Sequence, residues 1–315
     1  MISIVTVTFN ARDHVLRCLR SVADAAPMRG DYEQIVVDNA SGDGTAEAVA
    51  RDFRGVTLIR QKENVGFARG ANAGMRIAGG AYILLLNPDC LVPAGAVESL
   101  AGFMDGHPQT GAASPMLVTP EGCPQISYAR FPRLLPHLLG LSPLGWIVPR
   151  RVKDIGFSGV PPSLEEREPR PVDAPAGSCL MVRRAAYEAT GGMDESFFTY
   201  YEDIDWAYRM DRQGWPCYYV PAVRVTHDMG ATWRALPEGV QLARSYEGKY
   251  IYFSRRHGPV AGAAVRWITL ACARLNVCIA SLLSSLGIAS DAWERKRAFN
   301  TTLLAVHRAY PTRVA

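Results

Sequence analysis

Acidic side chains follow short apolar runs in this sequence, at places where they could bind a cation or move a proton. One run ends at Asp38 and leads into a polar, glycine-rich turn, and another ends in Asn87-Pro88-Asp89. A carboxylate at a strand end can accept a hydrogen bond from a base or a ribose, and hard divalent cations share carboxylate oxygens with phosphates. Further along, Tyr201-Glu202-Asp203-Ile204-Asp205 carries more negative charge than the first turn of a helix requires.

Other patterns suit a ligand but have structural alternatives. The small residues of Asn64–Gly74 would let a diphosphate approach the N–H groups at a helix start, or they could serve a tightly packed helix. Asn39–Asp43 could be a turn whose aspartate caps the next helix. His227 alone is more often structural than a ligand. Neither GxGxxG nor the P-loop pattern occurs in the glycine-rich run.

These residues lie among alternating strand-like and helix-like segments, which predict an α/β fold with a mostly parallel sheet. Ligands of such sheets bind at the carboxyl ends of the strands. The expected strands are Ile2–Phe9, Glu33–Val37, Val56–Ile59, Ala81–Leu86 and Ala112–Leu117. The expected helices are Asp13–Ala25, Thr45–Phe53, Ala68–Ala78, Pro93–Gly106, Arg184–Thr190 and Glu202–Gln213.

Two regions do not show this alternation of strand-like and helix-like segments. Residues 118–175 lack clear periodicity, so we expect a mobile insertion or lid within a catalytic domain of residues 1–235. Residues 236–315 are expected to form a helical extension. Its run Pro259–Leu286 is apolar, but Arg266 and Arg274 interrupt it, which disfavours a spanning helix. The run is either an in-plane membrane anchor or a hairpin packed on the catalytic domain or on a second subunit, which leaves a homo-oligomer open.

Composition excludes several classes of protein. The 315 residues carry a net charge of +4, which disfavours nucleic-acid binding. Seven scattered cysteines, none in a CxxC pair, fit neither a disulfide framework nor a zinc cluster and indicate a reduced, cytoplasmic protein. Met1–Phe9 has the pattern of a strand and lacks the basic and long apolar regions of a signal peptide.

Together and in this order, the motifs resemble glycosyltransferase family 2 with the GT-A fold, especially its bacterial rhamnosyltransferase-like branch, which builds cell-surface polysaccharides. The resemblance extends from Ile2 to about Trp233. The segments that carry it are Ser3–Asn10, Val37–Gly44, Asn64–Phe67, Asn87-Pro88-Asp89, Gly191–Phe198, Tyr201–Asp205 and His227.

The resemblance implies a role for each segment. The donor nucleotide-sugar would contact Thr8, Asn10, Asp38, Asn39, Gly66, Phe67, Asn72, Asn87 and Asp89. Asn87 stands where the family carries the first acid of its Asp-x-Asp motif, which leaves Asp89 as the main carboxylate on Mg²⁺ or Mn²⁺, with His227 completing the coordination. The catalytic base maps onto Asp203, although spacing alone does not choose it over Glu202. Asp194, Glu195 and Glu202 are candidates for acceptor or sugar hydroxyls.

The implied reaction is an inverting, metal-dependent transfer of a sugar to a hydroxyl group. L-rhamnose from dTDP-rhamnose is the first choice of donor, and UDP-galactose, UDP-glucose or a GDP-sugar would need few changes. The acceptor is a saccharide, linked to polyprenyl diphosphate if the C-terminal helices lie on the inner face of the cytoplasmic membrane. A nucleotidylyltransferase is disfavoured by the acidic motif at Tyr201–Asp205. A non-catalytic assembly subunit is disfavoured by Asp89, Asp203 and His227.

Overall fold

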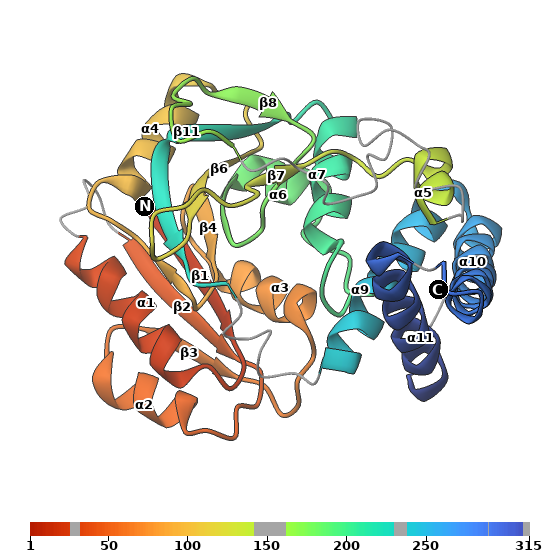
Figure 1. The fold of residues 1–315 in the computed structure, drawn as a ribbon. Helices are drawn as coiled ribbons and strands as arrows, with labels where there is room; N and C mark the ends of the chain where they lie inside the picture. The colour runs from red at the N-terminus through yellow and green to blue at the C-terminus, as the bar shows by residue number, and fades with distance from the viewer. Residues whose placement is uncertain (26–31, 142–161, 230–237, 289, 311–315) are drawn as a thin grey trace. The chain divides into compact units, whose positions relative to one another are not determined.

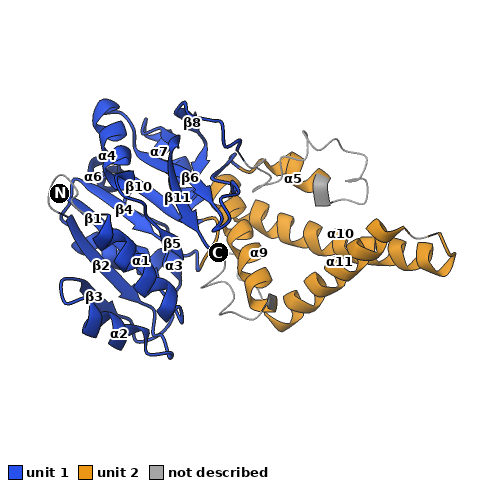
Figure 2. Cartoon of the chain, turned by 60° about the vertical axis from the view of Figure 1, so that its left-hand side comes forward, with its two compact units in different colours: residues 1–131, 159–198, 202–235 blue, residues 132–158, 199–201, 236–315 orange. Residues whose placement is uncertain are grey.

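The computed structural model describes residues 1–25, 32–141, 162–229, 238–288 and 290–310 (Figure 1). The chain divides into two compact units (Figure 2). Unit 1 comprises Met1–Phe131, Gly159–Phe198 and Glu202–Ala235, and unit 2 comprises Pro132–Ser158, Thr199–Tyr201 and Leu236–Ala315. The expected boundary near residue 235 falls outside the described residues, as does part of the expected insertion.

Unit 1 is built on a mixed, mostly parallel sheet, as predicted. Its strands are β1 (Ile2–Thr8), β2 (Tyr32–Asp38), β3 (Thr57–Arg60), β4 (Tyr82–Leu86), β5 (Cys90–Leu91), β6 (Ala112–Val118), β8 (Arg170–Val172), β10 (Cys179–Arg183) and β11 (Cys217–His227). They lie in the order β3-β2-β1-β4-β10-β6-β11-β5, and β8 pairs with β11. β10 is antiparallel to both neighbours, and the short β5 is antiparallel to the end of β11.

Helices cover both faces of this sheet, which explains why β1 is buried from Ser3 to Thr8 without alternation. The helices of unit 1 are α1 (Arg12–Asp24), α2 (Thr45–Asp52), α3 (Phe67–Ile77), α4 (Ala96–Gly106), α6 (Arg184–Thr190) and α7 (Glu202–Arg212). Helices α1 and α2 pack on the face that carries Val36, and α3 packs on the opposite face (Figure 1). At Gly74 of α3 a methyl group would overlap Val5, so glycine allows this close approach.

The stretch expected as an insertion contains short elements where it is described. These are β7 (Tyr128–Ala129), α5 (Leu134–Leu141) and β9 (Ala174–Pro175), together with β8, and β7 pairs with β9. Helix α5 belongs to unit 2, whereas the strands belong to unit 1. The strands among these elements are too short to leave a periodic pattern in the sequence, so none of these strands was predicted. Movement of the segment as a lid stays a prediction.

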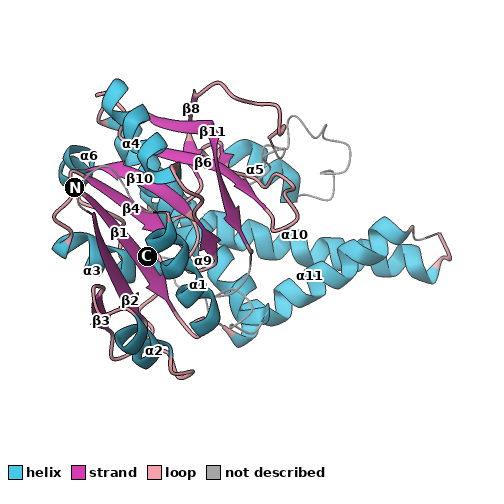
Figure 3. Cartoon of the chain, turned by 90° about the vertical axis from the view of Figure 1, so that its left-hand side faces the viewer, coloured by secondary structure: helices cyan, strands magenta, loops and turns pink. Residues whose placement is uncertain are grey.

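Unit 2 is helical in its described part. Its long helices are α9 (Glu238–His257), α10 (Pro259–Ser285) and α11 (Asp291–Ala309). Helix α10 packs on both α9 and α11, and Figure 3 shows α10 and α11 side by side along their length. Tyr250 of α9 and His307 of α11 share a buried hydrogen bond of 2.9 Å. By length and composition α10 is the one described helix that could cross a membrane.

Candidate active site

The carboxyl ends of β1, β2 and β4 bring the first predicted site residues to one edge of the sheet. Thr8 and Asp38 are paired neighbours at the ends of β1 and β2. Asp38 is 3% exposed, and its Oδ2 accepts a hydrogen bond of 3.1 Å from the N–H of Ser41. Its Oδ1 and the hydroxyl of Thr8 find no hydrogen-bond partner among the described residues. Buried polar groups normally have partners, so these two atoms suit a ligand.

Two turns beside Asp38 are joined by Asn10. The side-chain oxygen of Asn10 accepts a hydrogen bond of 2.8 Å from Gly42, and its N–H donates to Ser41 Oγ at 2.9 Å. The backbone of Asn10 has a φ of 47°, a conformation that asparagine tolerates better than most residues. Asp43 accepts hydrogen bonds from the N–H groups of Arg12 and Thr45, both at 3.1 Å, so this aspartate holds the turn, while the N-cap position of α2 is Gly44.

The glycine-rich run forms the start of α3, where it contacts a later segment of unit 1. Gly66 has a φ of 86° and a ψ of 176°, and a methyl group there would overlap the carbonyl oxygen of Phe198. The N–H of Phe67 donates to that same oxygen at 2.6 Å. Asn39 donates from Nδ2 to the carbonyl of Gly66 at 3.0 Å, while its buried Oδ1 has no hydrogen-bond partner among the described residues.

Asn72, predicted to line the donor site, holds a neighbouring segment of the protein. Its Nδ2 donates to Met193 O at 2.8 Å and lies 3.1 Å from Glu195 Oε1, and its Oδ1 accepts from the N–H of Met193 at 3.0 Å. Glu195 also forms an ion pair with Arg76 at 2.7 Å. Asp194 accepts a hydrogen bond from the N–H of Ser196 at 2.9 Å. Contacts of these side chains with a ligand stay predictions.

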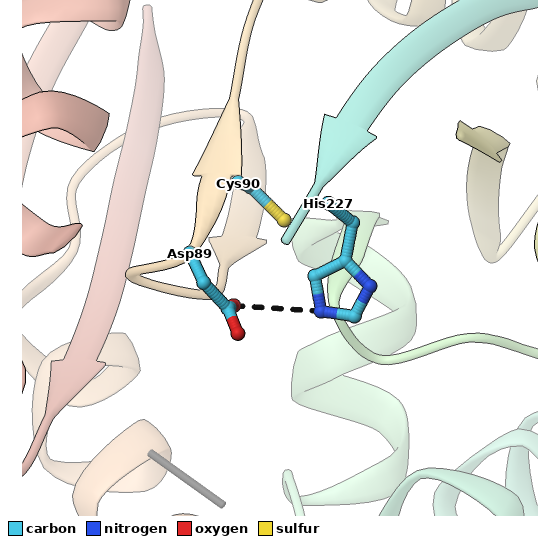
Figure 4. Close-up of side chains that lie close together, drawn as sticks. All are labelled: Asp89, Cys90 and His227. Atoms are coloured by element: carbon cyan, nitrogen blue, oxygen red, sulfur yellow. Dashed lines mark ion pairs between the residues drawn. The ribbon is translucent and has the colours of Figure 1, made fainter. Parts of the chain in front are cut away.

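Asp89 and His227 come together from distant segments of the sequence. The pairing of β5 with β11 places His227 beside Cys90, and the N–H of Asp228 donates to Asp89 O at 2.9 Å. Asp89 Oδ1 lies 3.4 Å from His227 Nε2, and both side chains are buried (Figure 4). Ligand atoms of Asp89, Cys90 and His227 all lie within 4.8 Å of one another.

Two members of this cluster fit a divalent cation. Two ligand atoms at right angles on an ion about 2.1 Å away are about 3 Å apart, close to the separation of Asp89 Oδ1 and His227 Nε2. Cys90 fits less well: its thiol donates to Ser178 O at 3.3 Å, and burial raises its pKa well above the ordinary value, which keeps it protonated. The half-buried Asn87 begins the motif, and its N–H donates to Ser178 O at 2.8 Å.

Helix α7 begins with the two candidate bases, and their surroundings differ. Asp203 Oδ2 accepts a hydrogen bond of 3.1 Å from the N–H of Gly177, and Oδ1 accepts one of 2.8 Å from Ile204. Burial raises the pKa of Asp203, and these N–H groups oppose the rise. Glu202 is buried, and its Oε2 has no hydrogen-bond partner among the described residues.

The pKa values of Glu202 and Asp203 are both raised, and different contacts add to or oppose the rise at each group. Burial, and then the charge of Asp203, raise the pKa of Glu202 well above its ordinary value. The pKa of Asp203 is raised as well, but the N–H groups of Gly177 and Ile204 oppose the rise, whereas the charge of Asp203 adds to the rise at Glu202. This arrangement favours Asp203 as the base, which spacing alone could not decide. Asp205 of the same motif forms an ion pair of 2.8 Å with Arg209.

Two consecutive residues, Gly177 and Ser178, connect the cluster that contains Asp89 with the candidate base Asp203. Gly177 donates its N–H to Asp203, and the next carbonyl, Ser178 O, accepts hydrogen bonds from Asn87 and Cys90. Neither residue was predicted from the sequence to belong to the site, nor was Gln125, whose side chain contacts His227. They lie in or beside the stretch without periodicity, where no pattern indicated a buried position.

Comparison with known proteins identifies the family of the chain. Residues 3–159 match the model of glycosyl transferase family 2. Over 280 residues the chain is 30% identical to an N-acetylglucosaminyl-diphospho-decaprenol L-rhamnosyltransferase of Mycobacterium tuberculosis, covering 85% of this chain and 88% of that protein. It is 26% identical to a low-salt glycan biosynthesis hexosyltransferase of Haloferax volcanii, covering 67% of this chain and 62% of that protein.

Solved structures show the same fold. A mannosyltransferase of Pyrobaculum calidifontis, solved with GDP-Man and Mn²⁺, aligns with a TM-score of 0.57 at 16% identity, covering 99% of this chain and 88% of that one. The predicted GT-A fold is thereby confirmed. With a relative at 30% identity over most of its length and a matching family model, the chain belongs to glycosyltransferase family 2 and is a glycosyltransferase.

Proposed function

We propose that the chain is an inverting, metal-dependent glycosyltransferase that moves L-rhamnose from dTDP-rhamnose to a saccharide on polyprenyl diphosphate, in cell-surface polysaccharide synthesis. The mycobacterial relative, named for rhamnosyl transfer to a diphosphodecaprenol-linked sugar, supports this substrate class. The observation that carries the reaction type is the half-buried Asp203 at the start of α7, whose carboxylate accepts hydrogen bonds from the N–H groups of Gly177 and Ile204.

In this reaction Asp203 accepts the proton of the acceptor hydroxyl as that oxygen forms its bond to the anomeric carbon. The bond from this carbon to the diphosphate breaks, and the nucleoside diphosphate leaves with the bonding electrons. Attack from the face opposite the leaving group inverts the anomeric configuration. Gly177 and Ile204 orient the carboxylate through their N–H groups, so the base is in place before the acceptor arrives.

Asp89 and His227 would hold the metal ion, either Mg²⁺ or Mn²⁺. Such an ion, when bound, neutralises negative charge on the diphosphate of the leaving group. The solved mannosyltransferase with the same fold contains Mn²⁺, which supports a divalent ion here. Asp38 and Thr8 would receive the nucleoside, because each carries a buried polar atom that the described protein leaves without a partner.

The first experiment measures calorimetric binding of dTDP, UDP and GDP with Mg²⁺, with Mn²⁺ and with chelator. We expect selective, metal-dependent binding of dTDP that Asp89→Ala abolishes. We expect Asp203→Asn to keep this binding while transfer falls about 10²- to 10⁴-fold, since only proton removal is lost. An Asp203→Asn protein with full transfer activity would exclude Asp203 as the base, whereas a wild type that binds lipid or partner enzymes but transfers no sugar would favour the non-catalytic assembly subunit.

An exposed stripe on α10 supports a membrane-linked acceptor. Along one side of the helix, exposed apolar side chains follow one another at spacings of three and four residues: Val260, Ala264, Trp267, Ala271, Leu275, Cys278 and Leu282. Trp267 is 62% exposed, and the guanidinium of Arg266 lies 5.6 Å from the centre of its ring. Exposed Arg274 borders the stripe, so apolar and cationic groups would meet lipid tails and anionic headgroups together.

The packing of α10 favours a helix that lies in the membrane surface. Its other side is buried on protein through Val265, Thr269, Ala273 and Ala280. The adjacent α11 carries the charged run Glu294–Arg297, which would be costly inside a bilayer. We therefore assign the protein to the inner face of the cytoplasmic membrane as a peripheral protein.

Vesicle flotation tests this assignment with phosphatidylglycerol and phosphatidylethanolamine vesicles. We expect the double variant Trp267→Ser, Leu275→Ser to bind at least about tenfold more weakly, because each large apolar side chain contributes about 1.5–3 kcal/mol when buried. Ile77→Ser is the control, because Ile77 is 51% exposed but lies on α3 in unit 1. Equal binding by all three proteins would refute the membrane assignment, and a concentration-dependent dimer that the double variant loses would assign the stripe to a second copy.

A further inference from the structure

Gln125 contacts the last residue of β11 through both ends of its amide. Its Nε2 donates to the carbonyl oxygen of His227 at 2.7 Å, and its Oε1 lies 2.9 Å from His227 Nδ1. The side chain is 7% exposed, and its own N–H donates to Leu117 O at 2.8 Å. The amide is therefore fixed in place by the end of β6 and by β11.

The donor and acceptor ends of the Gln125 amide decide which nitrogen of the His227 imidazole carries a hydrogen. An amide nitrogen only donates, so the contact with His227 O assigns Nε2, and a flipped amide would bring two oxygens to 2.7 Å. The other end, Oε1, only accepts. His227 Nδ1 must therefore carry a hydrogen, and in a neutral imidazole Nε2 then carries a lone pair.

That lone pair faces an acidic group. His227 Nε2 lies 3.4 Å from Asp89 Oδ1. An ionised carboxylate offers only lone pairs, so two acceptors face each other across this distance in buried surroundings. The arrangement is favourable when a proton or a cation lies between them, and it is the arrangement that two ligands of one metal ion require.

We propose that Gln125 is a positioning residue for His227, which fixes the ring and its Nδ1–H form so that the Nε2 lone pair points toward Asp89. Gln125 does not touch the ion and acts through His227. This inference rests on the metal-dependent function proposed above. Loss of the residue that accepts a hydrogen bond from a metal-binding histidine commonly weakens metal binding by about 10- to 100-fold.

The first test needs no metal. Nitrogen NMR of histidine-labelled protein at alkaline pH reports which ring nitrogen carries the hydrogen, and the signal of His227 is assigned by its loss in His227→Asn. We expect the Nδ1–H form in the wild type and a shift toward Nε2–H in Gln125→Met, where Asp89 can then accept. A wild type with Nε2–H, or an unchanged form in Gln125→Met, would overturn the proposal.

The second test measures Mn²⁺ affinity by calorimetry without a donor nucleotide. We expect Gln125→Met to bind about 10- to 100-fold more weakly. We expect Gln125→Glu to stay near wild type at a pH at which its carboxyl group is protonated, because that group then donates to His227 O and still accepts from Nδ1–H. Gln34→Met is the matched control, since Gln34 is also buried but lies on β2. If Gln125→Met does not fold, Gln125→Glu decides, because affinity as weak as that of Asp89→Ala would overturn the proposal.

The two proposals fail separately. A wild type that binds no Mn²⁺ but shows the Nδ1–H form that Gln125→Met loses would refute the metal-dependent function and support the positioning of His227. If the wild type and Gln125→Met bind Mn²⁺ with the same affinity, the role of Gln125 is refuted and the proposed metal site is retained.

Discussion

Gly66→Ala should weaken unit 1 through two separate effects. Gly66 has a φ of 86° and a ψ of 176°, a region that side chains avoid at a cost of about 1–3 kcal/mol. The added methyl group would also lie 2.9 Å from Phe198 Cδ2 and overlap the Phe198 carbonyl oxygen. Overpacking of this kind costs about 1–3 kcal/mol more, so the free energy of unfolding should fall by about 2–6 kcal/mol.

Gly258 provides a matched control for the backbone effect. Like Gly66, it precedes a helix, with a φ of 88° and a ψ of 163°, but a methyl group there would have no neighbour within 4 Å. In Gly258→Ala the free energy of unfolding should therefore fall by only about 1–3 kcal/mol, from the backbone conformation alone. Urea unfolding followed by circular dichroism measures both changes, each in the transition that includes its unit.

The difference between the two variants isolates the contact with Phe198. If Gly66→Ala loses no more stability than Gly258→Ala, the close approach of Phe198 to the start of α3 is refuted. A real contact has a second effect, because Asn39 donates to Gly66 O and would shift with it. Calorimetry should then show weaker dTDP binding by Gly66→Ala and unchanged binding by Gly258→Ala.

Three further predictions concern the carboxylates of α7. The rate of transfer should fall as the pH is lowered through the raised pKa of Asp203, because protonation removes the base. Glu202→Gln should unfold like wild type near pH 4.5 and be more stable above it. The gain, about 1.4 kcal/mol for each pH unit up to the pKa of Glu202, arises because the wild type must keep a proton that its unfolded chain releases. Urea unfolding across pH 4–8 measures this, and parallel curves would contradict it. Arg209→Met should destabilise unit 1 by about 3–5 kcal/mol, because buried Asp205 would lose its ion pair, and an effect under 1 kcal/mol would show that the pair is dispensable.

Local patterns predicted the parallel half of the fold well, for physical reasons. Strands β1, β2 and β4 are buried on both faces, so their apolar runs stand out from the amphipathic helices between them. The ends of these strands then placed Asp38 and Asp89 at one edge of the sheet. Helices α6 and α7 were predicted to within a residue because a glycine follows the end of each, and α7 also has an acidic first turn.

Pairings between distant segments could not be predicted in the same way. Cys90–Leu91 is too short to show alternation, yet its pairing with β11 brings His227 to Asp89. Gln125 and Gly177 act through one hydrogen bond or two, and such contacts leave no trace in local hydrophobicity. Composition likewise did not choose between Glu202 and Asp203, because the choice depends on which of them receives the N–H groups of Gly177 and Ile204.

The hydrogen bonds of Gly177 and Ser178 join the two halves of the proposed site through consecutive residues. A shift of this short stretch would move the carboxylate of Asp203 and the backbone of Asn87 together. Anything that fixes one half therefore reduces the freedom of the other, and linkage makes the effect equal in both directions. Nucleotide binding beside Asn87 would order the base before the acceptor arrives, and acceptor binding at Asp203 would tighten the hold on the nucleotide.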